Sequence, residues 1–226
     1  MNAGRQGTKS ALVAGASGLV GRALAELLSG SGDYDPVHLL NRRRLGLSAS
    51  PIREHVVDFE HLDSGVSDID AVDDAFCCLG TTIGKAGSRA AFRRVDHDYV
   101  VAFGKLAAKL GARTLVVVSS LGADPRSRNF YLKVKGETER DLGRLQLPSL
   151  VILRPSLLTG DREEFRPGER VGGAVLSVVS RLMKGPLGRF RPVSAVRVAR
   201  AMVMSAREPP TALTVLESEE IRSATT

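Results

Sequence analysis

Three evenly spaced glycines follow the first apolar run of the chain, and they constrain its fold more than any other feature. The run Ala11–Gly15 predicts a buried strand, and Leu19–Ser29 carries apolar residues at the spacing of a helix. Gly15 allows a tight turn between them, Gly18 lets the backbone approach a pyrophosphate, and Gly21 lets the helix pack against its strand. A strand, a glycine-rich turn and a helix in this order predict a dinucleotide-binding site.

The helix after this turn would direct its first N–H groups and its partial positive charge at the phosphates of the dinucleotide. The alternative is a glycine-rich turn without a ligand, which the strand–turn–helix context disfavours. The turn and the first helical residues are therefore the predicted cofactor contacts: Gly15, Ser17, Gly18, Leu19, Val20 and Gly21.

The rest of the chain alternates short apolar runs with amphipathic stretches, as strand–helix–strand units do. Several runs are apolar at every position, as strands covered by helices on both faces require. Further strands are predicted at Val37–Asn41, His55–Phe59, Ala75–Leu79, Thr114–Ser119, Ser149–Arg154 and Leu213–Leu216. Further helices are predicted at Ala90–Leu110, Tyr131–Leu145, Val171–Lys184 and Val193–Ala206. The pattern predicts an α/β fold with a doubly wound, mostly parallel sheet.

The length of 226 residues suits a single domain. We expect residues 1–9 to form a flexible tail and residues 10–155 to form the dinucleotide-binding core. Residues 156–226 would add the last strand and a small substrate lobe over the strand ends. Within that lobe, an apolar stripe along Val171–Lys184 is expected to cover the substrate cleft. A monomer and a homodimer are both compatible with this organisation.

The second predicted strand runs directly into Arg42, Arg43 and Arg44 and has no carboxylate at its end. A carboxylate there would bind the ribose hydroxyl of NAD, whereas arginine accommodates the 2′-phosphate of NADP. We therefore predict NADP(H), with Arg42 and Arg43 binding the phosphate; a solvated basic turn is the alternative. Asp58 and Phe59 end the third predicted strand, where they would contact the adenine.

A tyrosine and a lysine four residues apart follow a strand that ends in two serines. Tyr131 and Lys135 would share one face of a helix, because positions i and i+4 are neighbours there. A nearby ammonium favours the phenolate of a tyrosine, whose pKa is ordinarily about 10, and brings it toward the working range. Ser120 would hold a substrate carbonyl beside them, with Ser119 as the alternative serine. The competing interpretation packs the Tyr131 ring in the core and leaves Lys135 in solvent.

These motifs together resemble a short-chain dehydrogenase/reductase. Several longer segments are similar, more narrowly, to the Tat-interactive protein family of atypical members, and the match covers roughly residues 10–216. The segments are Phe76–Thr82, Gly84–Gly87, Arg94–Val100, Ser119–Asp124, Tyr131–Glu137, Leu153–Pro155, Asp161–Glu163 and Arg166–Glu169.

The resemblance implies a Rossmann fold that binds NADPH. It implies that Leu79 and Gly80 lie along the cofactor, and that Tyr131 is the proton donor or acceptor. Lys135 would hold the nicotinamide ribose. Of the two serines, Ser120 better matches the catalytic position of the wider superfamily.

Two later positions, Leu158 and Arg166, match cofactor contacts of the family after the sixth strand. One departure concerns the proton relay. Classical members place an asparagine in the helix before the fifth strand, whereas the aligned residue of this chain is Asp96. The resemblance therefore supports cofactor binding without supporting the standard relay.

The composition argues against several other classes of protein. The sequence contains no run of eighteen apolar residues, the length that a bilayer-spanning helix needs, so no membrane is expected. The adjacent Cys77 and Cys78 lie in an apolar run, which predicts buried thiols, no disulfide framework and a reducing cytoplasm. The four histidines lack the spacing of metal ligands, so no metal is expected. Residues 154–207 hold eleven basic and four acidic side chains, but aromatic residues are too few to favour nucleic acid.

Three functions remain open. The favoured one is an NADP(H)-dependent oxidoreductase that moves hydride between the nicotinamide and a small carbonyl or alcohol, with Tyr131 handling the proton. Arg162, Arg166 and Arg170 hint at an anionic substrate. The second is an NADPH-sensing regulatory protein with little turnover. The third is a nucleotide-sugar epimerase or dehydratase, which ranks last because such enzymes usually carry a larger C-terminal substrate domain than the roughly seventy residues after the sixth predicted strand.

Overall fold

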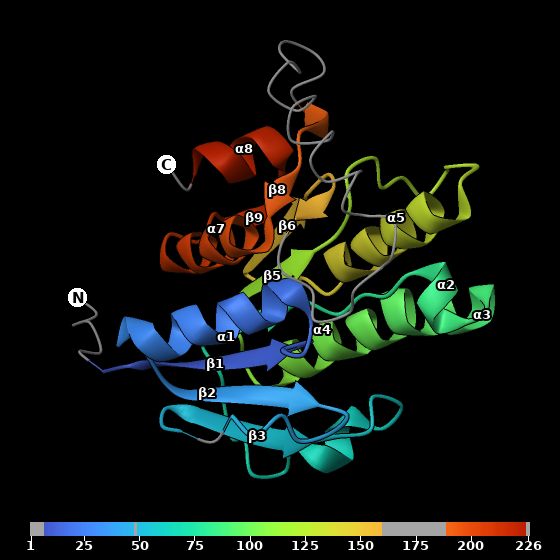
Figure 1. Ribbon diagram of the computed structural model, residues 1–226. Helices are drawn as coiled ribbons and strands as arrows, with labels where there is room; N and C mark the ends of the chain where they lie inside the picture. The colour runs from blue at the N-terminus through green and yellow to red at the C-terminus, as the bar shows by residue number, and fades with distance from the viewer. Residues whose placement is uncertain (1–6, 48, 160–188, 225–226) are drawn as a thin grey trace.

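The computed structural model describes residues 7–47, 49–159 and 189–224, and a seven-stranded parallel sheet runs through its centre (Figure 1). The strand order is β3-β2-β1-β4-β5-β6-β9. The strands are β1 (Lys9–Ala14), β2 (Tyr34–Asn41), β3 (Ile52–Val56), β4 (Asp74–Cys77), β5 (Thr114–Val118), β6 (Ser149–Arg154) and β9 (Ala212–Glu217). Two short strands, β7 (Leu158–Thr159) and β8 (Val193–Ser194), pair separately. All of these pairings are parallel, which confirms the predicted fold class.

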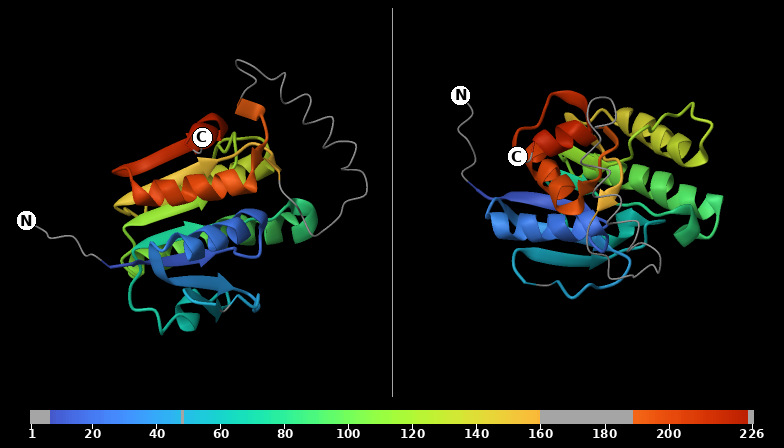
Figure 2. Two further views of the ribbon diagram at one scale, coloured as in Figure 1. Left: turned by 60° about the vertical axis from the view of Figure 1, so that its left-hand side comes forward. Right: turned by 45° about the horizontal axis from the view of Figure 1, so that its top comes forward.

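Helices cover both faces of the sheet (Figure 2). One face carries α1 (Leu19–Ser31) and α7 (Ala195–Arg207), and the other carries α4 (Tyr99–Lys109) and α5 (Phe130–Gly143). The shorter helices are η1 (Leu62–Gly65), α2 (Ile83–Ala86), α3 (Arg89–Arg93), η2 (Arg94–Asp98) and α8 (Ser218–Ser223). This three-layer arrangement explains why the central strands are apolar at every position.

The core is divided by the sheet into two apolar layers. Along β1, Ala11 and Val13 face the layer under α1 and α7, whereas Leu12 and Ala14 face the layer under α4 and α5. All four side chains are fully buried. A leucine or valine buried in this way stabilises the fold by about 1.5–3 kcal/mol relative to an exposed one. The apolar runs of the sequence therefore place the strands correctly, with small shifts at their ends.

The third strand is the largest displacement from the sequence prediction. It was expected at His55–Phe59 but forms as β3, residues Ile52–Val56, at the edge of the sheet. Val57 and Phe59 leave the sheet and are buried in the same apolar layer as Leu62. The apolar residues that suggested a strand thus belong to a loop that folds over the core.

The predicted helix Ala90–Leu110 is divided by a wider turn. Its first part is α3, the next five residues form a π-helical turn, η2, and α4 completes it. In the turn the Tyr99 N–H donates to the Arg94 carbonyl, five residues back. A π-turn of this kind inside a helix is rare and is frequent at functional sites.

The C-terminal part of the chain contributes to the sheet and to one of its covering layers. β9 forms the seventh strand, and α7 packs on α1. Val193 and Ser194, predicted as the start of a helix, pair with β7, after which the Ser194 hydroxyl caps α7. The predicted helix Val171–Lys184 lies outside the described residues, so the substrate lobe stays a prediction. None of the helices among the described residues is both long and apolar enough to cross a bilayer.

Candidate functional site

The strand order reverses between β1 and β4, and in doubly wound sheets ligands bind at the carboxyl ends of the strands at such a point. The loops after these two strands touch one another. Gly15 has a φ of +89°, and a Cβ atom on it would lie 2.6 Å from the carbonyl of Cys78. The Cys78 N–H in turn donates to the Ala14 carbonyl at 2.8 Å. The glycine turn and the loop Cys78–Gly80 therefore lie side by side at the point where a doubly wound sheet is expected to bind its ligand, a region that we call the crevice.

The three glycines of the turn are required for different reasons. A Cβ atom on Gly21 would lie 2.1 Å from the Gly15 carbonyl oxygen, so the fold itself excludes any side chain there. A Cβ atom on Gly18 would lie 3.4 Å from the same oxygen, and Gly18 is exposed. The fold therefore tolerates a side chain at Gly18, and the predicted contact of Gly18 with a pyrophosphate stays a prediction.

The amino terminus of α1 has the properties of an anion-binding site. Gly18 occupies the cap position and has no side chain to bond the first N–H groups of the helix. The first helical turn contains no acidic residue, so its N–H groups and partial positive charge suit the pyrophosphate of a dinucleotide. Ser17 is exposed and Leu19 is half-buried, but the Val20 side chain is buried in the core. Val20 could therefore meet a phosphate only through its backbone.

A hollow of about 410 Å³ adjoins the glycine turn at the end of β2. Its lining residues are Ser17, Asn41, Arg42, Arg43 and Leu45. The predicted 2′-phosphate-binding arginines thus share one hollow with the turn. The loop that carries them is held to β3, because the Leu45 N–H donates to the Glu54 carboxylate at 3.0 and 3.2 Å.

The predicted adenine contacts behave differently from one another. Asp58 follows β3 and is exposed, and the N–H of Glu60, together with the His61 ring, lowers the pKa of its carboxyl. Phe59 is buried in the core, where its ring lies 5.5 Å from that of Tyr99. The Phe59 ring therefore belongs to the core, so a contact between Phe59 and adenine would have to come from its backbone, and this contact stays a prediction.

The other end of the crevice is formed by α5. The Asn129 side chain accepts a hydrogen bond from the Leu132 N–H and caps the helix, which carries Tyr131 and Lys135 one turn apart. A Cβ atom built on Gly80 would lie 3.6 Å from the Lys135 Nζ. The lysine therefore reaches the loop after β4, where the resemblance places Leu79 and Gly80 along the cofactor.

The environment of Lys135 is buried and charged. Only 5% of this residue is exposed, and its Nζ lies 2.8 Å from Asp96 Oδ1. Burial by itself lowers the pKa of Lys135, but Asp96 and Tyr131 outweigh burial and raise it overall, so the side chain is an ammonium. Burial of Lys135 excludes the interpretation in which it lies in solvent. The Tyr131 ring is half-buried and packs 5.5 Å from the ring of Phe92.

The two serines after β5 differ in their partners. The Ser119 hydroxyl donates to the buried carboxylate of Glu139, which Arg154 also holds with its Nε at 3.0 Å. The Ser120 hydroxyl lies 3.5 Å from the Leu121 carbonyl, the upper limit of a hydrogen bond. Ser119 is therefore committed to the helix, and Ser120 is the better placed of the two to meet a substrate.

The remaining predicted contacts are only partly placed. Leu79 is half-buried, and Leu158 lies in β7 and packs against the core layer under α7. Arg166 lies outside the described residues, as do Arg162 and Arg170, which suggested an anionic substrate. Sequence reasoning missed Glu139 and the pairing of Asp96 with Lys135, since their partners are distant in the sequence.

The two cysteines, Cys77 and Cys78, are unpaired and lie in apolar surroundings. Burial raises the pKa of Cys77 to about 12 and that of Cys78 well above its ordinary value, so both are neutral thiols. The described part of the chain contains no group of three or more potential metal ligands.

Comparison with known proteins adds family and fold. A family model described as NAD(P)H-binding matches residues 15–209. The rat protein HTATIP2 is 41% identical over 164 residues, which span 71% of this chain and 67% of the rat protein. The protein FMP52, mitochondrial, of Eremothecium gossypii is 36% identical over 221 residues, or 95% of this chain and 96% of the relative.

Solved structures share the fold at low sequence identity. The complex of MoeE5 with UDP-glucose and NAD has a TM-score of 0.68 at 20% identity and covers 95% of this chain and 80% of its own. A UDP-N-acetylglucosamine 4-epimerase from Methanobrevibacter ruminantium has a TM-score of 0.69 at 16% identity, with coverage of 93% and 76%. These likenesses establish the Rossmann architecture.

The cytoplasmic location expected from the cysteines is contradicted by the relatives. Proteins of Eremothecium gossypii, Debaryomyces hansenii and Coccidioides immitis that match this chain are all named mitochondrial. Unpaired thiols indicate only that a compartment is reducing, so they could not single out the cytoplasm.

Proposed function

The chain belongs to the NAD(P)H-binding family of the HTATIP2 and FMP52 proteins, atypical short-chain dehydrogenases/reductases, and from this premise we propose that it is an NADP(H)-dependent oxidoreductase. Its reaction would transfer hydride between the nicotinamide and a small carbonyl or alcohol. Tyr131 would be the proton donor or acceptor.

One observation supports this function above the others. Lys135 is buried at the crevice end that adjoins Gly80, and Tyr131 lies one turn earlier on the same face of α5. A phenol beside a fixed ammonium is suited to exchange a proton with a carbonyl or alcohol oxygen. This pair lies at the same end of the sheet as the glycine turn, so one extended dinucleotide could reach both.

The roles of the residues follow from their chemistry. When bound, NADPH supplies the hydride. The hydroxyls of Ser120 and Tyr131 would hold the carbonyl oxygen of the substrate, and Tyr131 would donate the proton that this oxygen needs on becoming an alcohol. Lys135 would bind the nicotinamide ribose and stabilise negative charge on the phenol oxygen as the proton leaves.

The preference for NADP(H) rests on the hollow beside the glycine turn. Arg42 and Arg43 line it together with Ser17. Guanidinium groups keep their charge and can bind two phosphate oxygens at once. A neutral ribose hydroxyl does not offer this interaction. The same hollow would therefore favour the cofactor that carries a 2′-phosphate.

The first test is NADPH consumption, followed by absorbance, with a panel of aldehydes, ketones and quinones. Tyr131→Phe should lower turnover by about 10²–10⁴-fold, because it removes the transferable proton, while NADPH still binds. Tyr34→Phe is the matched control, since it removes a phenol at the start of β2, whose hydroxyl donates to Asp74 at the opposite end of the sheet from the glycine turn. Turnover by Tyr131→Phe at the wild-type rate would contradict the assignment.

The sensor function remains the second candidate, because the phosphate-binding turn and its arginines form without Tyr131. It predicts tight NADPH binding without turnover of any carbonyl. In cells, Gly18→Val should then abolish function while Tyr131→Phe leaves it intact, and equal loss in both variants would argue against a sensor.

A further inference from the structure

Asp96 is a fully buried carboxylate at the position where the classical relatives place an asparagine. It lies within the π-turn η2, between α3 and α4. A buried charge is costly unless other groups compensate it, so its neighbours indicate what it does.

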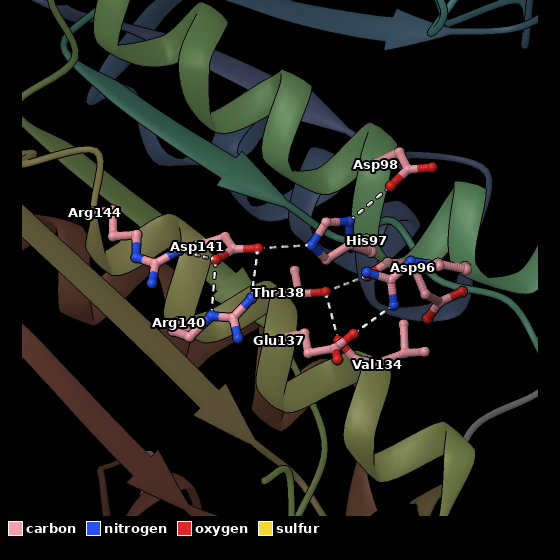
Figure 3. Close-up of polar contacts among 10 residues, drawn as sticks. Asp96, His97, Asp98, Val134, Glu137, Thr138, Arg140, Asp141 and Arg144 are labelled. Atoms are coloured by element: carbon pink, nitrogen blue, oxygen red, sulfur yellow. Dashed lines mark hydrogen bonds and ion pairs between the residues drawn. The ribbon is translucent and has the colours of Figure 1, made fainter. Parts of the chain in front are cut away.

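The backbone of the π-turn is tied to α5. The Thr138 hydroxyl lies 2.9 Å from the carbonyl oxygen of Asp96 and 2.8 Å from that of Val134, one turn earlier on its own helix. Figure 3 shows Thr138 directed from α5 toward Asp96. A π-turn disturbs the regular helical ladder, and Thr138 supplies a donor to a carbonyl within it. This contact fixes the position of the π-turn along the axis of α5.

The side chain of Asp96 connects two further elements. Its Oδ1 lies 2.8 Å from Lys135 Nζ on α5. Its Oδ2 accepts a hydrogen bond of 2.8 Å from the Thr81 N–H, in the loop that follows Leu79 and Gly80. One carboxylate thus joins the π-turn, the helix that carries Tyr131 and the loop beside the cofactor crevice.

Charged contacts also join the π-turn region to α5, along the line where the two pack together, which we call the seam (Figure 3). His97 lies between Asp98 and Asp141, with its Nδ1 2.7 Å from one carboxylate and its Nε2 3.0 Å from the other. Arg93 bonds Glu137 across the seam. These contacts limit rotation of the π-turn against α5, so Asp96 is held in a defined position inside.

We propose that Asp96 is a positioning residue of this site, which holds the Lys135 ammonium against the Gly80–Thr81 loop and so fixes where Lys135 meets the nicotinamide end of the cofactor. Only the expected effect of Asp96 on turnover rests on the proposed function. Its structural part, the control of Lys135 by Asp96, can be measured without any substrate.

Asparagine at position 96 would separate the two roles of the side chain. An amide oxygen can still accept from the Thr81 N–H, but an amide cannot pair with the ammonium. The titratable groups that face Lys135 are Asp96 of η2, Tyr131 of α5 and Cys77 of β4, and Cys77 is a neutral thiol. Without Asp96, burial dominates and lowers the pKa of Lys135.

The first measurement is the ionisation of Lys135 by NMR, in full-length protein with ¹³C-labelled lysine side chains. The chain has seven lysines, and Lys135→Arg identifies the signal of this one. In the wild type, Lys135 should keep its proton at a pH where exposed lysines lose theirs, about 10.4. In Asp96→Asn its midpoint should fall by about one to three pH units.

A matched control is Asp74→Asn. Asp74 is also buried and lies 3.1 Å from the Nζ of Lys9, but it begins β4 at the opposite end of the sheet. It should leave the Lys135 midpoint unchanged. An unchanged midpoint in Asp96→Asn, or a wild-type Lys135 that titrates with the exposed lysines, would overturn the proposal; the second test needs no variant to fold.

NADPH affinity and turnover complete the test. Asp96→Asn should weaken NADPH binding by about tenfold, the loss expected for one misplaced charged contact, and should lower turnover further, whereas Asp74→Asn should alter neither. A wild type without turnover would contradict the oxidoreductase, yet the NMR and binding results would still decide the role of Asp96. Equal loss of affinity in both variants would reduce Asp96 to a structural residue.

Discussion

The two ends of the dinucleotide crevice are built in opposite ways. At the proposed phosphate end, the predicted contacts are backbone N–H groups, Gly18 and exposed arginines, and the fold makes little use of them. At the nicotinamide end, Lys135 and Asp96 are buried and paired, and Glu139 holds Ser119 and Arg154. Substitutions at the nicotinamide end should therefore lower both stability and catalysis. Most substitutions at the phosphate end should lower only the affinity for the cofactor.

The largest difference should appear when one partner of a buried pair is removed. Lys135→Met should lower the free energy of unfolding by about 3–5 kcal/mol, because Asp96 would be left as an uncompensated buried charge. Urea unfolding measures this change. The double variant Lys135→Met with Asp96→Leu removes both charges and should recover much of the loss. A double variant as unstable as the single one would mean that packing, not charge, holds this end.

Gly21, like Gly15, is a position of the phosphate end where the fold should not tolerate a side chain. Gly21→Ala places a Cβ atom 2.1 Å from the Gly15 carbonyl oxygen and should cost about 3 kcal/mol of unfolding free energy. Gly18→Ala is its control, since a Cβ atom there has ordinary contacts. That variant should fold like the wild type and bind NADPH more weakly. Similar stability of the two variants would remove the distinction between these glycines.

The arginines test the opposite expectation, a loss of cofactor affinity without a loss of stability. Arg42→Ala combined with Arg43→Ala should weaken NADPH binding by about 10–100-fold, leave NADH binding unchanged and leave stability within about 0.5 kcal/mol. Calorimetric titration with both cofactors measures this. Arg44→Ala serves as control, because Arg44 does not line the hollow. Equal losses for NADH and NADPH would show that the arginines do not read the 2′-phosphate.

The smallest effect concerns the two serines. Ser119→Ala removes a donor to a buried carboxylate that Arg154 still holds, so it should cost about 1.5 kcal/mol of unfolding free energy. Ser120→Ala should change stability by less than about 0.5 kcal/mol. Thermal and urea unfolding of both variants test this. Equal stability would mean that Ser119 is no more committed to the fold than Ser120.

The local structure of the proposed phosphate end could be predicted from the sequence, because its determinants are adjacent in the chain. Gly15 and Gly18 lie between β1 and α1, Gly21 lies in the first turn of α1, and the arginines follow the next strand directly. Local pattern is enough when the ligand contacts are backbone groups of one turn. The same locality explains why the parallel sheet and its covering helices could be predicted from apolar periodicity.

The nicotinamide end was less predictable, because its contacts join distant residues. Thr138 and Asp96 are 42 positions apart, and Glu139 meets Ser119 20 positions away. No periodicity marks a helix residue that will pair with a charge on another element. The displaced third strand has a related cause, since the apolar character of Val57 and Phe59 indicates burial but not whether a strand or a loop provides it.

The attachment of α5 on both sides has a consequence for the motions of the protein. Separating this helix from its neighbours would strip Lys135 from Asp96 and Glu139 from Ser119 and Arg154 at once. Local opening costs least where few buried contacts are lost, so α5 should open only when the whole molecule unfolds. Its amide hydrogens should then exchange as slowly as those of the central strands, while those of the glycine turn exchange early. A dinucleotide would thus arrive at a catalytic end already in place and order chiefly the turn that receives its phosphates.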